Sequence, residues 1–332
     1  MSERALDLAI TGVVPVRGRA VGVAPDAASP DGRSVRVRMS SGLSPMARAD
    51  LLSFVRGADA IVTMFTDRVD DEFLDAAGPS LRCVCNFAVG TDNIDFAACE
   101  RRGIVVRSTP DVVTEGTANL AMGLILACAR RIVQADAYVR TGRFSREGNT
   151  FPTGWMGMDL CGRELLIVGA GRIGYAVAQR ALAFGMRIAY VSRSRKLAFE
   201  IAPLAARRVE LDAGLASADV VSIHTPLTPE TRGMIDARRL SLLKPDAIIV
   251  NTARGAVIDE AALAKILCER RIWGAGLDVF EHEPRVHPDL PGLDNVVMTP
   301  HIGSAEQRWR EEMTIVAVSA AMDGWRASRR AE

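Results

Sequence analysis

Short apolar runs alternate with longer amphipathic stretches along the first third of this 332-residue chain. The apolar runs predict buried strands, and the amphipathic stretches predict helices. The predicted strands are residues 6–11, 34–39, 59–64, 81–87 and 104–107, and the predicted helices are residues 45–55, 70–77 and 94–101. Because strands alternate with helices, we expect a parallel, doubly wound sheet. Residues 12–30 are rich in Gly, Pro and Ala and predict no element.

A second alternating segment follows a long predicted helix at residues 114–140 and a Gly-rich loop at residues 141–159. Asp259 predicts the N-cap of one of its helices. Ser304 and Gln307 predict a capping box for a last helix, which we expect to end near Trp325. Six strands with helices between them match a complete dinucleotide-binding domain. The predicted strands are residues 165–168, 187–191, 220–225, 247–252, 274–280 and 295–299.

The first strand of this second segment leads directly into a G-x-G-x-x-G motif. Gly169 allows the tight turn, Gly171 lets the backbone approach a pyrophosphate, and Gly174 lets the next helix pack on the strand. Amides at the start of that helix would bind the anion. Because the motif lies between a predicted strand and a predicted helix, it predicts a dinucleotide site.

Three charged side chains follow later predicted strands and suit the reduction of a 2-keto acid. Arg254 can hold a carboxylate with two parallel hydrogen bonds. His301 can give a proton to the carbonyl oxygen as hydride reaches the carbon, and Glu283 can hold its tautomer and keep it protonated. Each has an ordinary alternative, as a surface ion pair, a solvated acid or a helix cap. Because the carboxyl ends of parallel strands meet at one edge, we expect the three to converge.

Several segments, in this order and spacing, resemble the D-isomer-specific 2-hydroxyacid dehydrogenase family. The resemblance covers the chain from about residue 81 to its end. It implies two doubly wound parallel-sheet α/β domains. A Rossmann cofactor domain at residues 109–299 would be inserted into a flavodoxin-like substrate domain made of residues 1–108 and 300–332. The matching segments are residues 87–95, 169–174, 224–231, 251–259, 274–284 and 295–305.

The same resemblance implies roles for the residues of the substrate site. His301 would be the acid and base, Glu283 its partner, and Arg254 the group that binds substrate. The backbone amides around Val89 and Gly90 would hold the substrate carboxylate. The implied substrates are small 2-keto acids and the corresponding 2-hydroxy acids.

The glycine motif and the resemblance together predict a set of cofactor-binding residues. In the family match, Arg172 and Ile173 lie along the pyrophosphate, and Asp278 faces the nicotinamide carboxamide. The predicted cofactor-binding residues are Gly169, Gly171, Arg172, Ile173, Gly174, Ser192, Arg193, Ser194, Arg195, Thr225, Pro226, Thr252, Ala253, Asp278, His301 and Gly303.

The end of the second cofactor strand predicts which nicotinamide cofactor is used. Family members that use NAD carry an acid there, about eighteen positions past the third glycine. This chain has Ser192 instead, followed by the sequence Arg-Ser-Arg-Lys. No acid is present to repel a 2′-phosphate, and cations can bind it, so we expect NADPH to be preferred, with NADH possible. A solvated basic loop is the alternative interpretation.

Residues 86–90 and 192–196 resemble the glyoxylate and hydroxypyruvate reductase branch, which implies reduction of a small 2-keto acid to the D-2-hydroxy acid. A phosphonate- or phosphite-type dehydrogenase is an alternative because residues 67–70 resemble that branch, although Val89 replaces its lysine. A 3-phosphoglycerate dehydrogenase is less favoured, because its long forms add a regulatory domain. An alternative of another class is a nucleotide-responsive, corepressor-like binding protein.

Composition narrows the possible partners. A net charge of +1, from 41 basic and 40 acidic residues, gives no reason to expect nucleic acid or a membrane surface. The longest apolar run, residues 120–129, is too short to span a bilayer. Six scattered cysteines predict no metal site, and without a secretory signal we expect the cytoplasm. The resemblance implies a homodimer built on the helix at residues 117–140. Trp155, in the loop after that helix, either lines the substrate mouth or packs a dimer contact.

Overall fold

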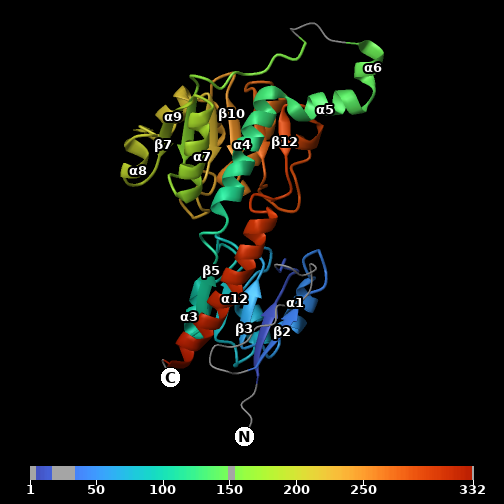
Figure 1. Ribbon diagram of the computed structural model, residues 1–332, viewed down its shortest axis with the longest axis vertical. Coiled ribbons are helices and arrows are strands. Elements are labelled where there is room, and N and C mark those ends of the chain that lie inside the picture. The colour runs from blue at the N-terminus through green and yellow to red at the C-terminus, as the bar shows by residue number, and fades with distance from the viewer. Residues whose placement is uncertain (1–4, 17–33, 149–153, 331–332) are drawn as a thin grey trace. The chain divides into compact units, whose positions relative to one another are not determined.

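The computed structural model of the protein describes residues 5–16, 34–148 and 154–330 (Figure 1). The chain forms two compact units. The first unit contains Met1–Val113 and Ser304–Glu332, and the second unit contains Thr114–Gly303. Most of residues 12–30, for which the sequence predicts no element, lie outside the described residues. Both ends of the chain therefore belong to one unit, and the middle of the chain forms the other.

The first unit contains a five-stranded sheet in the order β2-β1-β3-β4-β5, with every neighbouring pair parallel. This is the flavodoxin-like order, so the predicted architecture is confirmed. Residues such as Ile61 and Val84 are fully buried, as expected for strands with both faces covered. The strands are β1 (Leu6–Ile10), β2 (Val35–Met39), β3 (Ala60–Thr63), β4 (Cys83–Asn86) and β5 (Val105–Ser108).

Four helices of the first unit cover its sheet. Leu51, Phe73 and Ala98 bring three of them onto one face, and α12 packs against β3, β4 and β5. The predicted capping box is wrong, because Ser304 lies in a turn and α12 begins only at Gln307. The helix also continues past Trp325, since no Gly or Pro follows to end it. The helices are α1 (Arg48–Phe54), α2 (Asp71–Ala77), α3 (Phe96–Arg101) and α12 (Gln307–Arg330).

The second unit contains a seven-stranded parallel sheet in the order β12-β11-β10-β9-β6-β7-β8. The order reverses at β6, which is the Rossmann arrangement that the sequence predicts. The strand count of six is wrong, because β8 consists of two exposed arginines that carry no apolar pattern. The strands are β6 (Glu164–Val168), β7 (Arg187–Val191), β8 (Arg207–Arg208), β9 (Val220–Ile223), β10 (Ile248–Asn251), β11 (Gly274–Leu277) and β12 (Val296–Met298).

Helices cover both faces of this second sheet. The pair α4 and α7 packs on the face that carries Leu165 and Ile167, and both helices are visible in front of the sheet in Figure 1. Leu215 and Leu263 pack on the opposite face. Asp259 accepts a hydrogen bond from the amide of Ala262 at 2.9 Å, which confirms the predicted N-cap. The helices on the two faces are α4 (Thr114–Arg130), α7 (Arg172–Ala183), α9 (Leu211–Ser217), α10 (Ala237–Leu240) and α11 (Glu260–Cys268), and α8 (Leu197–Glu200) follows β7.

The helix predicted at residues 114–140 is in fact two helices, α4 and α5 (Ile132–Arg140), with a bend of 65° between them. Arg131 adopts a left-handed conformation with φ of 52°, and no Gly or Pro marks the break in the sequence. The predicted loop at residues 141–159 also contains a short helix, α6 (Arg143–Glu147). Among the described residues, no single helix is long and apolar enough to cross a bilayer; α4 and α5 meet those limits only as a bent pair.

Candidate active site

The glycine motif forms a cradle between β6 and α7. A Cβ atom on Gly169 would lie 2.6 Å from the carbonyl carbon of His224, and one on Gly174 would lie 2.5 Å from the carbonyl oxygen of Gly169. A Cβ atom on Gly171 would meet nothing within 4 Å. The open space therefore lies at the N-cap of the 12-residue α7, where helix amides bind anions. This cradle fits the pyrophosphate of a dinucleotide, with Arg172 and Ile173 in the first turn of the helix.

The loop at residues 192–196 follows β7 and contains the predicted 2′-phosphate ligands. The hydroxyl of Ser192 donates to the carbonyl oxygen of Ser194 at 2.5 Å. Arg195 forms an ion pair with Glu200, which also accepts a hydrogen bond from the hydroxyl of Tyr190 at 2.6 Å. These two bonds hold the pKa of Glu200 below its ordinary value, so Glu200 is ionised and pairs with Arg195, one of the cations predicted to bind the phosphate.

Four more of the predicted cofactor residues follow β9 and β10 at the carboxyl edge of the sheet, with Thr225 and Pro226 after β9 and Thr252 and Ala253 after β10. The buried hydroxyl of Thr252 has no hydrogen-bond partner in the described parts of the chain. His224, to which sequence reasoning gave no role, has its Nε2 atom 2.8 Å from the hydroxyl of Ser222. Burial lowers the pKa of His224 to about 3, so this imidazole is neutral.

His301 and Glu283 are directly paired. The Nδ1 atom of His301 lies 2.8 Å from Oε2 of Glu283, and the amide of Phe280 donates to Oε1 of Glu283 at 3.0 Å. Burial alone would raise the pKa of Glu283. The hydrogen bond and charge of His301, the amide of Phe280 and the charge of Arg254 outweigh burial and hold that pKa below its ordinary value. The ionised carboxylate assigns the proton to Nδ1, so Nε2 is the ring atom that can exchange a proton with substrate.

The turn that carries His301 is built around Asp278, which is 1% exposed. One oxygen of Asp278 accepts from the hydroxyl of Thr299 at 2.6 Å and from the amide of Ile302 at 2.8 Å, and the other accepts from the amide of Gly303 at 2.8 Å. Burial raises the pKa of Asp278 despite these donors. The turn holds His301 in a left-handed conformation, with φ of 54°. Contact between Asp278 and the nicotinamide stays a prediction.

Arg254 follows β10 on a segment that lies against the backbone near Glu283. The side-chain amide of Asn251 donates to the carbonyl oxygen of Arg254 at 2.9 Å and fixes this turn. A Cβ atom on Gly255 would lie 1.9 Å from the carbonyl carbon of Phe280, so only glycine permits this approach. The second unit therefore brings Arg254, Glu283 and His301 together, and the charge of Arg254 contributes to the lowered pKa of Glu283.

Val89 and Gly90 lie in the first unit, in the loop that follows β4. The side-chain amide of Asn86 donates to the carbonyl oxygen of Gly90 at 2.7 Å. Within the described residues, the amides of residues 88–91 donate no hydrogen bond. Such amides can bind an anion, which suits the predicted contact with a substrate carboxylate.

Comparison with known proteins establishes the family. The family described as "D-isomer specific 2-hydroxyacid dehydrogenase, NAD binding domain" matches residues 122–303. The glyoxylate reductase of Thermococcus onnurineus is 50% identical over 269 residues, which are 81% of this chain and 80% of that protein. The chain belongs to the D-isomer-specific 2-hydroxyacid dehydrogenase family. It is therefore an oxidoreductase that uses NAD or NADP, as the sequence predicts.

Solved structures are similar to this dehydrogenase in both fold and sequence. A protein of Thermus thermophilus is 40% identical with a TM-score of 0.85, and the match covers 97% of each chain. The NADPH-dependent glyoxylate/hydroxypyruvate reductase of Sinorhizobium meliloti, solved with NADP and malonate, is 33% identical with a TM-score of 0.78. That match covers 95% of this chain and 92% of the other. The predicted family and fold class are confirmed.

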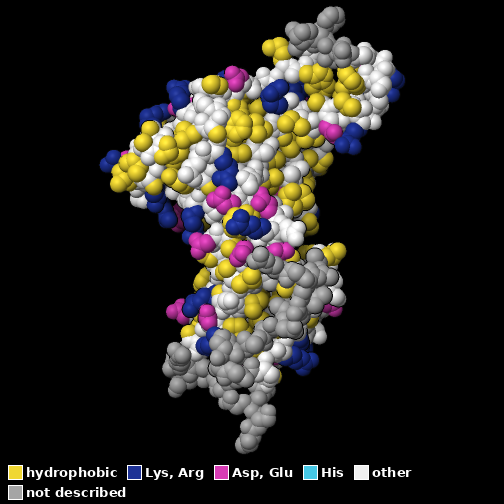
Figure 2. Space-filling view, in the orientation of Figure 1, with side chains coloured by type: hydrophobic (Ala, Val, Ile, Leu, Met, Phe, Trp, Pro, Cys, Tyr) yellow, Lys and Arg dark blue, Asp and Glu magenta, His cyan; other side chains and the backbone are white. Residues whose placement is uncertain are grey.

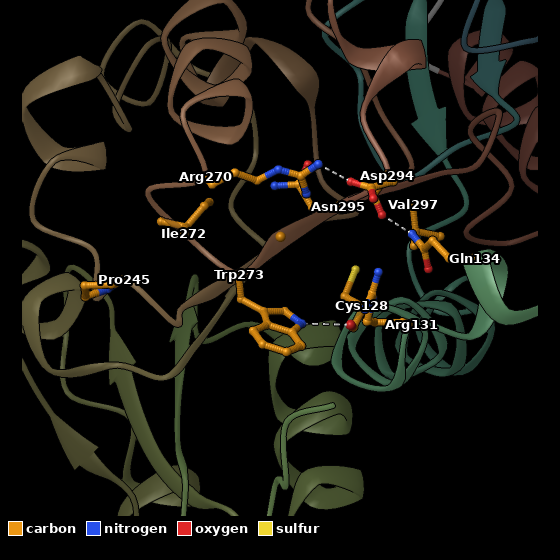
Figure 3. Close-up of a pocket in the computed structure, with 11 residues that line it drawn as sticks. Cys128, Arg131, Gln134, Pro245, Arg270, Ile272, Trp273, Asp294, Asn295 and Val297 are labelled. Atoms are coloured by element: carbon orange, nitrogen blue, oxygen red, sulfur yellow. Dashed lines mark hydrogen bonds and ion pairs between the residues drawn. The ribbon is translucent and has the colours of Figure 1, made fainter. Parts of the chain in front are cut away.

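A cavity of about 330 Å³ lies away from these residues of the dehydrogenase (Figure 3). It is found at the amino ends of two strands, beside Gly274 at the start of β11 and Asn295 just before β12. The indole of Trp273 lines it and donates to the carbonyl oxygen of Cys128 at 3.0 Å. Ligands of such sheets bind at the carboxyl ends, so this cavity is not the candidate active site. The described residues contain no group of three or more His, Cys, Asp or Glu placed to hold a metal ion.

Proposed function

We propose that this dehydrogenase reduces glyoxylate and related small 2-keto acids, including hydroxypyruvate, to D-2-hydroxy acids, with NADPH as the preferred cofactor. The observation that carries the proposal is the 2.8 Å contact between His301 and an ionised Glu283, with Arg254 close enough for its charge to act on the same carboxylate. The Thermococcus relative is a glyoxylate reductase, which supports glyoxylate as substrate.

When bound, the reduced nicotinamide supplies the hydride that reaches the keto carbon. His301 donates the proton on Nε2 to the carbonyl oxygen, and it takes a proton back in the reverse direction. Glu283 holds Nδ1 and stabilises the imidazolium before transfer. The turn built around Asp278 fixes the position of the His301 backbone, because three hydrogen bonds hold the carboxylate of Asp278 in that turn.

The substrate carboxylate is bound by Arg254 through two parallel hydrogen bonds. We include the amides around Val89 and Gly90 as further donors to this carboxylate, because the family resemblance assigns them that role and they donate to no acceptor within the described chain. Val89 is uncharged at a position where phosphite oxidisers carry a lysine, which favours a small carboxylate over an inorganic dianion.

The preference for NADPH is supported by the loop at residues 192–196. No acid occupies the end of β7. The pKa of Glu230 is lowered mainly by hydrogen bonds from Thr228 and from its own amide, and to a smaller extent by the charge of Arg193. Arg195 is paired with Glu200, so it must share its donors with a phosphate. The NADP bound to the Sinorhizobium relative supports the same cofactor.

We further propose a homodimer that forms through α4, α5 and α6. Three apolar side chains of α5, Ile132, Val133 and Val139, are 49–56% exposed, and Figure 2 shows hydrophobic side chains gathered over this region. Trp155 lies edge-on against Tyr138, with 5.3 Å between ring centroids, and extends the same surface. Light scattering on the purified chain tests the dimer, and a monomer at assay concentration would contradict it.

The experiment for the proposed activity is the oxidation of NADPH and NADH, followed at about 340 nm through the reduced nicotinamide, with a panel of keto acids. The panel contains glyoxylate, hydroxypyruvate, pyruvate, phenylpyruvate, 3-phosphohydroxypyruvate and a phosphonate aldehyde. We expect the highest kcat/KM with glyoxylate or hydroxypyruvate and NADPH. Turnover of only the phosphonate aldehyde would contradict the proposed 2-keto acid substrates. Equal or better kcat/KM with NADH would contradict the proposed preference for NADPH.

A further inference from the structure

The loop that follows β7 is held by an arginine from the short edge strand β8. The Nη2 atom of Arg208 donates to the carbonyl oxygen of Ser192 at 3.0 Å and to that of Arg193 at 3.2 Å. Arg208 is 16 and 15 residues away from these two positions in the sequence. It therefore contacts the backbone of the predicted phosphate loop from outside that loop.

This contact sets the direction of two backbone amides. In a trans peptide the C=O and N–H groups point in opposite directions, and neither peptide here is among the cis bonds of the described chain. Because the carbonyl groups of Ser192 and Arg193 both point to Arg208, the amides of Arg193 and Ser194 both point away from it. Neither amide donates a hydrogen bond within the described residues. Successive amides with a shared direction form a concave site for anions.

The side chains of the loop are less well placed to bind a phosphate than these two amides. Arg195 is 73% exposed and paired with Glu200, so a phosphate has to compete with an acid for its guanidinium. Binding through a long exposed side chain also costs rotamer entropy, which a fixed backbone amide does not lose. The amide pair is therefore the part of the loop that is already arranged for an anion.

We propose that Arg208 is a positioning residue that determines cofactor specificity. By holding the carbonyl groups of Ser192 and Arg193, it presents the amides of Arg193 and Ser194 to the 2′-phosphate of NADPH. This inference rests on the proposed preference for NADPH. Arg208 acts through the backbone, so ligands that lack the 2′-phosphate do not depend on it.

The test compares two variants of neighbouring residues on β8. Arg208→Gln removes the guanidinium, and its side chain is too short to place a nitrogen where Nη2 of Arg208 donates to the two carbonyl oxygens. Arg207→Gln is the matched control, because it removes the same charge from a side chain that pairs with Glu164 at 3.1 Å instead of with the loop. Calorimetry on the full chain measures the Kd for 2′,5′-ADP and for 5′-AMP, and nicotinamide fluorescence measures the Kd for NADPH and NADH.

We expect Arg208→Gln to raise the Kd for 2′,5′-ADP and NADPH by about tenfold, the usual worth of one charge-assisted hydrogen bond. The Kd for 5′-AMP and NADH should change by less than about twofold, which also shows that the cofactor fold is intact. Equal losses for ligands with and without the phosphate, or equal effects of the two variants, would overturn the inference.

The same data separate this inference from the function on which it rests. A wild-type chain that binds 2′,5′-ADP no better than 5′-AMP overturns the proposed NADPH preference, and the role of Arg208 with it. A wild-type chain that selects the phosphate, with an unchanged Arg208→Gln variant, overturns the role of Arg208 alone.

Discussion

Replacing Glu283 with glutamine removes the negative charge beside His301 and keeps the shape of the side chain. Nδ1 and Oε2 lie 2.8 Å apart, and the two side chains are 24% and 30% exposed. With about 4 Å between charge centres and an effective dielectric constant of about 20, unit charges interact by about 4 kcal/mol. Solvent contact reduces this value, so we expect the imidazolium to lose about 2–3 kcal/mol of stabilisation.

Reduction requires a protonated His301, so the Glu283→Gln variant should remain active at acid pH and lose activity as the pH rises. At about 1.36 kcal/mol for each factor of ten in rate, a loss of this size should lower kcat at a fixed neutral pH by at least about tenfold. The direction follows from the charge, because an imidazole without its carboxylate partner releases its proton more easily. In the wild type, the lowered pKa of Glu283 keeps the carboxylate ionised across the neutral range.

The assay is steady-state kcat for glyoxylate with saturating NADPH, from about pH 5 to about pH 9, the range that spans the ordinary titration of histidine. Glu281→Gln is the matched control, because it makes the same charge change two residues away in a side chain that is 34% exposed. The control should follow the wild-type profile. If the Glu283→Gln variant keeps wild-type kcat at neutral pH, the reasoning is refuted.

Three further predictions concern other parts of the site. Arg254→Lys should raise the KM for glyoxylate by about tenfold or more, with the Kd for NADPH unchanged by calorimetry, because an ammonium cannot form two parallel bonds; an unchanged KM would contradict it. Gly171→Ala should weaken NADPH binding with no change in Tm, since its Cβ meets nothing within 4 Å, whereas Gly174→Ala should lower Tm, since its Cβ would lie 2.5 Å from a carbonyl oxygen. Asp278→Asn should lower the free energy of unfolding in urea by about 1.5–3 kcal/mol, because an amide NH₂ cannot accept one of the three hydrogen bonds that the carboxylate of Asp278 accepts. The kcat should also fall, because the turn that carries His301 loosens. An unchanged free energy of unfolding would exclude that role of Asp278.

Much of the fold could be predicted because buried parallel strands are continuous apolar runs. Residues 165–168 and 247–250 are such runs, and β6 and β10 form there. The short strand β8 could not be found this way, since two exposed arginines become a strand only by pairing with β7. The break between α4 and α5 at Arg131 could not be predicted either, because the left-handed conformation of this arginine depends on tertiary contacts and no Gly or Pro marks it in the sequence.

The candidate site shows the same division. Arg254, Glu283 and His301 could be chosen from their positions after predicted strands, and the structure brings them together in one unit. The sequence could not show that both oxygens of Asp278 bind the turn of His301, because a buried carboxylate and a ligand-facing one look alike in sequence. The contacts of Arg208 were also invisible, since they depend on the strand that the apolar pattern missed.

Because Gly255 lies so close to the backbone of Phe280, the residue at this one position indicates whether a related protein can form the same site. Any side chain there would overlap the backbone of Phe280, so the segments that carry Arg254 and Glu283 approach this closely only if the residue between them has no Cβ atom. A related protein can keep the arginine, the acid and the histidine and still lack this arrangement if a larger residue replaces that glycine. The smallest residue of the site is therefore the one that tells whether three recognisable side chains can work as a single unit.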